Sequence, residues 1–208
     1  MRALAMLVSL AAFGATTGAE AGAATATATA AASTSAPANA LVAGVFSPPR
    51  SAPAFTLAGS DGAPLRLDRF RGKVVLLSFG YTSCTEVCPV TLSILAQARR
   101  LLGAAAGDVQ VIYVTVDPER DTAMRMREFL KAFDPGFLGG TGTAAQLAAV
   151  RQDYGISVGG KIPMGSGYAL AHSSFTYLVD RQGMLRALMP FGHGAADFAH
   201  DVRLLLAP

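Results

Sequence analysis

The sequence predicts an α/β fold in which helices flank a central mixed β-sheet. Two continuous apolar runs, at residues 74–79 and 109–116, are typical of central strands that are covered on both faces. A helix-like segment follows each run, and a hairpin comes before the last helix, so the order is strand, helix, strand, helix, helix, hairpin, helix. A hairpin beside helix-connected strands indicates both parallel and antiparallel pairing.

The first residues have the composition of an export signal. A basic start at Arg2 is followed by a short apolar stretch and by an Ala-Glu-Ala cleavage site that ends at Ala21. We therefore predict a signal peptide at residues 1–21. An uncleaved anchor is the alternative, although the apolar stretch is shorter than the roughly 20 residues of a membrane span. Either form predicts an exported protein that is periplasmic or attached to the outer face of the inner membrane.

A change of composition marks the start of the folded domain. Residues 22–42 are rich in Ala and Thr and carry almost no charge, which is typical of a disordered linker. Residues 43–208 are long enough to bury one hydrophobic core. We expect a single domain over this range.

Short elements lie on either side of the first buried strand. Residues 53–57 read as an entry segment, and residues 59–62 have the composition of a turn. After the strand, a helix begins either at the first cysteine, capped by Ser83, or at Pro89 in the favoured first helical position. In both cases the helix continues to Gly103.

The later elements follow from apolar periodicity between turn residues. They are the strand at 109–116, helices at 122–133, 143–154 and 195–206, and a hairpin of 175–179 with 184–188.

The charge pattern excludes one class of partner. The formal net charge is +3 and the pI is about 9.1. The basic residues are scattered and do not alternate with aromatic residues along a stripe, so we expect no nucleic-acid partner.

Cys84 and Cys88 are the two cysteines of the chain, and they follow the first buried strand. In a helix, this spacing puts both side chains on one face with Cβ atoms about 5–6 Å apart. A disulfide needs about 3.5–4.5 Å, so closing one requires a distorted turn. Pro89 favours such a distortion because it lacks a backbone N–H. We expect the pair to hold a soft metal when reduced and to form a disulfide when oxidised.

Two further expectations concern the thiols. A purely structural disulfide is the alternative, but a bridge across so few residues closes a small loop and stabilises little. Cys84 lies nearer the helix N-terminus, so it should have the lower thiol pKa and be the better nucleophile.

The cysteines lie at the first strand-to-helix junction, which is the thioredoxin-like arrangement. Three segments then resemble the Sco family, thioredoxin-fold assembly factors for cytochrome c oxidase. They are residues 79–89 around the cysteines, residues 116–122, and His172 shortly before residues 177–183. The segments lie in the family's order, and the similarity covers residues 48–205.

The resemblance implies that residues 43–208 are a thioredoxin-like Sco domain in which Cys84, Cys88 and His172 bind copper. Two thiolates and an imidazole suit Cu(I), whereas Zn(II) is usually four-coordinate. The implied function is that of a copper-binding metallochaperone for the dinuclear copper site of cytochrome c oxidase. The alternative is a thiol-disulfide oxidoreductase that reduces the cysteines of that copper site.

The same resemblance implies the partners. They are the copper-site subunit of the oxidase and, for the alternative function, a protein thiol reductant. Membrane contact is expected only through an uncleaved leader.

Two positions depart from the family's pattern. The family usually has Pro where this chain has Thr85, and Asp before the histidine where this chain has Ala171. A nearby carboxylate orients an imidazole ligand, so Ala171 is expected to lower copper affinity without changing the ligand set.

Other polar residues are expected to be structural. His193 is predicted in a loop and His200 on the polar side of the last helix, and neither is expected to bind metal. Asp117 and Asp121 flank a strand-to-helix turn, where Asp commonly caps the helix or makes a local turn. A peroxiredoxin is disfavoured because its Pro-x-x-x-Thr-x-x-Cys segment is missing.

Overall fold

The computed structural model describes residues 40–207. The predicted signal peptide at 1–21 and the predicted linker up to residue 39 lie outside the described residues. Where the described part begins, the backbone amides of Val42 and Ala43 donate hydrogen bonds of 2.8 and 2.9 Å to the buried Asp201 carboxylate. The start of the fold is thereby attached to its last helix.

The main sheet has eight strands, and its pairing confirms the predicted mixed sheet. At its centre, β4 (Val74–Gly80) runs parallel to β5 (Val109–Thr115) and antiparallel to β9 (Phe175–Val179). The strand order is β1-β10-β9-β4-β5-β6-β2-β3. The other strands of this sheet are β1 (Gly44–Ser51), β2 (Leu57–Gly59), β3 (Pro64–Leu65), β6 (Leu138–Thr141) and β10 (Met184–Pro190).

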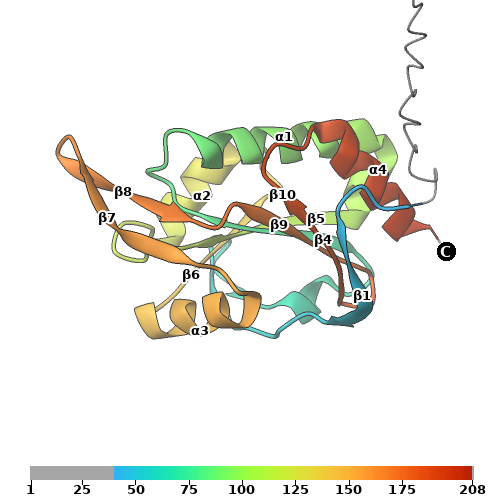
Figure 1. The fold of residues 1–208 in the computed structure, drawn as a ribbon, viewed down its shortest axis with the longest axis horizontal. Coiled ribbons are helices and arrows are strands. Elements are labelled where there is room, and N and C mark those ends of the chain that lie inside the picture. Colours follow the sequence, from blue (N-terminus) through green and yellow to red (C-terminus); the bar gives the residue numbers. More distant parts are fainter. Residues whose placement is uncertain (1–39, 208) are drawn as a thin grey trace, which may run out of the picture. The chain divides into compact units, whose positions relative to one another are not determined.

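Helices cover both faces of the sheet. They are α1 (Val87–Leu102), α2 (Ala123–Lys131), α3 (Ala144–Tyr154) and α4 (Ala195–Leu206). Figure 1 shows α1 and α4 along one face and α3 along the other. None of the helices in the described residues has both the length and the apolar character to cross a membrane.

The burial of β4 explains its position at the centre. All seven of its residues are buried, as its continuous apolar run predicts. Side chains alternate along a strand, so Phe79 points to the α3 face, where it contacts Tyr154. Ser78 and Gly80 face α1 and α2, together with Tyr113 of β5, which contacts Phe129 of α2. The strand therefore carries one apolar core on each face.

The ends of α2 and α3 follow local sequence signals. Thr122 caps α2 by accepting a hydrogen bond from the backbone of Arg125. Thr143 and Gln146 form a reciprocal capping box at the start of α3. Gly155 ends that helix with a φ of 65°, which a residue with a side chain rarely adopts.

The start of α1 differs from both predicted starts. The helix begins at Val87, and Glu86 is the residue before it, with no side-chain cap. The capping box predicted at Ser83 is therefore wrong. Pro89 is the third helical residue instead of the first, which is tolerated because the first N–H groups of a helix have no partner within it.

Four sets of strands were not predicted. They are β1, the short antiparallel pair of β2 and β3, β6, and a separate two-stranded sheet of β7 (Val158–Met164) with β8 (Gly167–His172). These segments contain glycine or proline at several positions, and both residues disfavour strands. In β6, Gly139 lies against Met126 of α2 and Gly140 lies against Leu65, and a Cβ at either position would come within 3 Å of its neighbour. Close packing favours this strand despite its low intrinsic propensity.

Candidate metal centre

The two cysteines lie where β4 passes into α1. Cys84 is half-buried in the connecting loop, and Cys88 is the second residue of α1 and is buried. Both are free thiols. The strand-to-helix junction thus brings the pair to one end of the sheet, as predicted.

The two thiols have opposite acidities. Hydrogen bonding from the Cys88 side chain, supported by the backbone N–H groups of Cys88 and Glu86, lowers the pKa of the Cys84 thiol to about 5. The same hydrogen bond, together with burial, raises the pKa of the Cys88 thiol far above its usual range. The predicted direction for Cys84 is confirmed, but its main cause is the neighbouring thiol. At neutral pH the pair holds one proton, on Cys88.

We expect this asymmetry to appear in alkylation kinetics. Because the pKa of Cys84 is lowered to about 5, its thiolate should form as pH rises through 5, and its rate with iodoacetamide should be level from about pH 6 to 8. An ordinary cysteine is still gaining thiolate near pH 8.5. In Cys84→Ser the remaining thiol should react slowly below pH 9, and in Cys88→Ala the midpoint for Cys84 should rise. A midpoint near 8.5 in the reduced wild type would contradict the assignment.

His172 ends β8 and reaches the buried thiol. Its Nε2 lies 3.5 Å from Cys88 Sγ. Its Nδ1 lies 2.8 Å from the carbonyl oxygen of Ser173. A carbonyl can only accept, so Nδ1 is the nitrogen that donates, and Nε2 is the nitrogen that faces the sulfur. The Tyr81 ring meets the imidazole edge-on, with centroids 5.9 Å apart.

The Ser173 carbonyl bears on the prediction that Ala171 lowers copper affinity. Metal-bound histidines usually donate their second N–H to a carboxylate or a backbone carbonyl. Here the backbone already supplies that acceptor. The imidazole is therefore oriented by the Ser173 carbonyl even though position 171 has no carboxylate.

The separation of Cys88 and His172 fits a shared metal ion. Thiolate and imidazole ligands lie about 2.3 and 2.0 Å from the metal in zinc sites, which places sulfur and nitrogen about 3.5–3.8 Å apart at tetrahedral or trigonal angles. The observed 3.5 Å matches that span. Across residues 40–207, no three Cys, His, Asp or Glu side chains are already arranged to hold a metal ion. A metal site made of these three residues would require Cys84 to turn toward Cys88 and His172.

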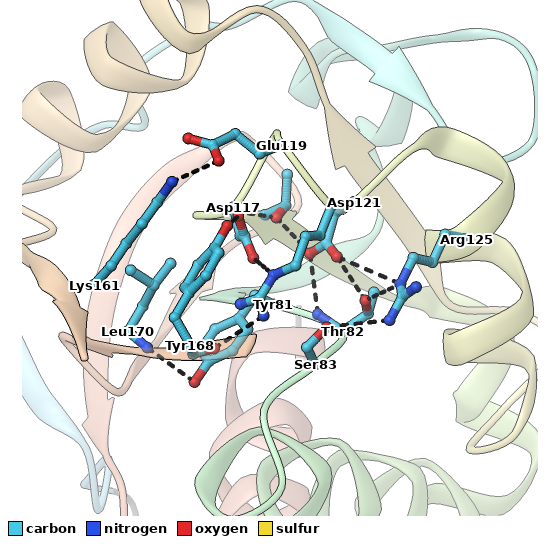
Figure 2. A network of polar contacts seen from close by, with 12 residues as sticks. Tyr81, Thr82, Ser83, Asp117, Glu119, Asp121, Arg125, Lys161, Tyr168 and Leu170 are labelled. Carbon is cyan, nitrogen blue, oxygen red and sulfur yellow. Dashed lines mark hydrogen bonds and ion pairs between the residues drawn. The ribbon is translucent and has the colours of Figure 1, made fainter. Parts of the chain in front are cut away.

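The β7–β8 hairpin that carries His172 is held by polar contacts with the turn after β5 (Figure 2). Tyr168 donates to Asp117 at 2.7 Å, and Lys161 pairs with Glu119 at 2.5 Å. Arg120 bonds Asp117 and the Tyr168 carbonyl, and its guanidinium lies 3.6 Å from the centre of the Tyr168 ring. Asp117 is structural, as predicted, but it orients the hairpin of the histidine as well as its own turn.

A second anchor joins the hairpin directly to the cysteine loop. The backbone N–H of Leu170 donates to the Tyr81 hydroxyl at 3.2 Å (Figure 2). Tyr81 lies three residues before Cys84 and two positions in β8 separate Leu170 from His172. This contact therefore links the two sides of the candidate centre.

Asp121 holds the loop before Cys84 in place through hydrogen bonds. It is fully buried and accepts hydrogen bonds from the backbone and hydroxyl of Thr82, at 3.0 and 2.5 Å, and from Thr115 at 2.6 Å. Figure 2 shows Arg125 beside it, with an Nε–Oδ1 distance of 3.9 Å. The predicted role as a cap is too narrow, because Asp121 connects β5, α2 and the loop before Cys84.

Two cavities differ in their chemistry. A pocket of about 290 Å³ opens over Cys84 and is also lined by Tyr81, His172 and the exposed Ile162 and Met164. A larger cavity of about 390 Å³ lies at the opposite end of β4 and contains neither cysteine nor histidine in its lining. The smaller pocket is therefore the one with reactive groups.

The other histidines lie away from the thiols. His193 contacts Asp197 at 3.2 Å, and His200 contacts Asp201 at 2.9 Å. Both contacts belong to α4 or the loop before it. Neither histidine lines the pocket over Cys84.

Comparison with known proteins decides the family. A model of the SCO1/SenC family matches residues 46–207. The chain belongs to the SCO1/SenC family. Relatives of this SCO1/SenC chain include an SCO2-like protein of Rickettsia felis, which is 35% identical over 132 residues. The match covers 62% of this chain and 64% of that protein. The mitochondrial SCO2 homolog of Bos taurus is 38% identical over 142 residues, covering 66% of this chain and 53% of that protein.

Solved Sco structures confirm the thioredoxin-like fold. ScoI of Bradyrhizobium japonicum, solved with copper bound, is 32% identical with a TM-score of 0.67, and the match covers 74% of this chain and 98% of that one. Against the curated relatives, this SCO1/SenC chain spans less than two thirds of their length.

Proposed function

We propose that the protein is a copper-binding metallochaperone in which Cys84, Cys88 and His172 hold Cu(I). One observation carries the proposal: Cys88 Sγ lies 3.5 Å from His172 Nε2, beside a second thiol of lowered pKa. Soft thiolates favour Cu(I) over harder metals. Copper-bound Sco structures support copper as the cargo.

The proposed recipient is the copper-site subunit of cytochrome c oxidase. Cys84 is half-buried and faces a pocket, whereas Cys88 is buried, so an incoming ligand can approach the metal from the Cys84 side. We propose that the protein acts after export, in the periplasm or attached to the outer face of the inner membrane. The apolar leader supports this location, and membrane contact would occur only through an uncleaved leader.

We expect His172→Ala to weaken Cu(I) binding at least about tenfold while the fold is kept. The change removes the imidazole and leaves two thiolates, and even the loss of a contact to a ligand typically costs about 10–100-fold in affinity. The measurement is anaerobic competition of the reduced protein with a Cu(I) chelator. The wild type should bind one Cu(I) per chain.

Matched variants control for the choice of histidine. His193→Ala and His200→Ala should change the affinity little, because their contacts lie in and before α4. Ala171→Asp should change it by less than about tenfold, because the Ser173 carbonyl already orients His172. Unchanged affinity in His172→Ala, with a clear loss in His193→Ala, would show that the wrong histidine was assigned.

A thiol-disulfide oxidoreductase is the second candidate. A thiolate at Cys84 beside a thiol at Cys88 is the arrangement that attacks a disulfide and then resolves the mixed disulfide. This function predicts repeated turnover with a thioredoxin-like donor and a target disulfide. Its potential must lie below that of the target, and about 30 mV corresponds to a tenfold change in equilibrium constant. A potential well above the target's, with tight Cu(I) binding, would leave only the chaperone.

A further inference from the structure

Tyr113 places a hydroxyl beneath the buried cysteine. It lies in β5, is 1% exposed, and faces α1. A Cβ added at Gly80 would lie 2.0 Å from the Tyr113 hydroxyl and 2.8 Å from Cys88 Sγ, so both atoms border the space that a side chain at position 80 would fill. Cys88, Tyr113 and His172 also line one small cavity. The hydroxyl and the sulfur are therefore neighbours in the core.

This hydroxyl has no hydrogen-bond partner within residues 40–207. An unsatisfied buried hydroxyl typically destabilises a fold, and phenylalanine would fill the same space without it. The nearby hydroxyl of Ser78 is engaged with Thr176 at 2.7 Å. Cys88 Sγ borders the same space as this hydroxyl, so it is the acceptor that we assign to Tyr113.

We propose that Tyr113 is a positioning residue whose O–H donates a hydrogen bond to Cys88 Sγ and stabilises the reduced and copper-loaded states of the site. The part of this inference that concerns copper affinity rests on the proposed function. The part that concerns the disulfide potential rests on the thiol pair alone. The metal-binding roles proposed for Cys84, Cys88 and His172 do not themselves require this tyrosine.

The chemistry of sulfur makes the contact dependent on state. A phenol keeps its proton at neutral pH, since tyrosine ordinarily ionises near pH 10. A thiolate sulfur bound to Cu(I) carries negative charge, and hydrogen bonds to charged groups are roughly twice as strong as neutral ones. In the metal-free reduced protein the Cys88 thiol donates a hydrogen bond to Cys84. A hydrogen bond from the Tyr113 hydroxyl to Cys88 would extend this into a chain in which each bond strengthens the next. A disulfide sulfur carries no charge and gains less from the donor.

The absence of a side chain at Gly80 permits this contact. Gly80 is the last residue of β4 and lies across from Cys88. Any Cβ there would displace the hydroxyl or the sulfur, because both distances are below 3 Å. The glycine, the tyrosine and the cysteine thus form one packed unit on three elements.

The test compares Tyr113→Phe with Tyr154→Phe. Tyr154 is also buried, lies on the α3 face, and donates to the Pro53 carbonyl at 2.8 Å. Tyr113→Phe should weaken Cu(I) binding about tenfold. It should also disfavour reduction of the Cys84–Cys88 disulfide in glutathione buffers by about tenfold, which is about 30 mV. Its resistance to denaturant should be unchanged or higher. Tyr154→Phe should be less resistant to denaturant, with unchanged copper affinity and potential.

Each other outcome has a defined meaning. Unchanged affinity and potential in Tyr113→Phe would overturn the proposal, as would a loss of stability and affinity of the same size in both variants. If the wild type binds no Cu(I), the proposed function fails, and the potential alone decides the role of Tyr113. A readout on unaltered protein is the Raman doublet of tyrosine, which reports phenol hydrogen bonding. It should change on disulfide formation in the wild type, and an unchanged doublet would count against the contact.

Discussion

Cys88→Ser is expected to remove high-affinity Cu(I) binding. Serine keeps the shape of the side chain, but its hydroxyl is a hard ligand that stays protonated at neutral pH, so a soft metal loses a ligand. Structural zinc sites with four ligands bind with about 10–16 kcal/mol, which is about 2.5–4 kcal/mol per ligand, or on the order of a hundredfold in affinity. Cys84→Ser should show a similar loss. Competition with a Cu(I) chelator under anaerobic conditions measures both.

Oxidation gives the same test without a mutation. A disulfide offers no thiolate, so the oxidised wild type should bind no Cu(I), and treatment with a reductant should restore one site per chain. Ser83→Ala is the matched control, since this loop serine lies beside Cys84 and its hydroxyl accepts from Arg125 at 3.1 Å. It should bind like the wild type. Full copper binding by the oxidised protein would remove the cysteines from the ligand set.

Asp121→Ala is expected to give the largest loss of stability among polar substitutions. The fully buried carboxylate accepts three hydrogen bonds, from the backbone and hydroxyl of Thr82 and the hydroxyl of Thr115, and lies 3.9 Å from Arg125. Breaking such a buried network costs about 3–5 kcal/mol, a large part of the roughly 5–15 kcal/mol that keeps a domain folded. Denaturant unfolding measures the change.

The same substitution should reach the candidate centre through Thr82, which lies two residues before Cys84. We expect weaker Cu(I) binding in the fraction that remains folded, because the loop loses its anchor. Asp68→Ala is the control: its ion pair with Arg66 is exposed, so its loss should cost less than about 1 kcal/mol. Equal stability losses in the two variants would show that the Asp121 network contributes little.

Sequence patterns predicted the elements that have a local signal, either a continuous apolar run or a helix cap. β4 and β5 are continuous apolar runs, and α2 and α3 begin at threonine caps, so their type and order were predictable. The start of α1 was misplaced because Ser83 and Pro89 both carry helix-start signals. The observed start at Val87 lies between these two positions and follows neither signal.

The rest of the candidate centre depends on contacts between distant segments. β7 and β8 have glycines and a proline with little alternation of polarity, and their position depends on Tyr168 and Arg120 meeting across 48 residues. In the sequence, Tyr113 is not distinguished from the other residues of its apolar strand, and its position beside Cys88 depends on β5 lying next to β4 in this register. In both cases the tertiary arrangement supplies the specificity.

The distance in sequence between the proposed ligands has a consequence for quality control. Cys84 and Cys88 stay four positions apart in any conformation, but His172 meets Cys88 across 84 positions only after the hairpin and the sheet have assembled. An unfolded copy offers copper a flexible dithiol and no fixed imidazole. Each tenfold preference of copper for the native state adds about 1.4 kcal/mol to its stability when copper is in excess. In the proposed function, copper supply would thus favour intact copies, and a copy whose sheet is damaged would hold copper only through its dithiol and therefore more weakly.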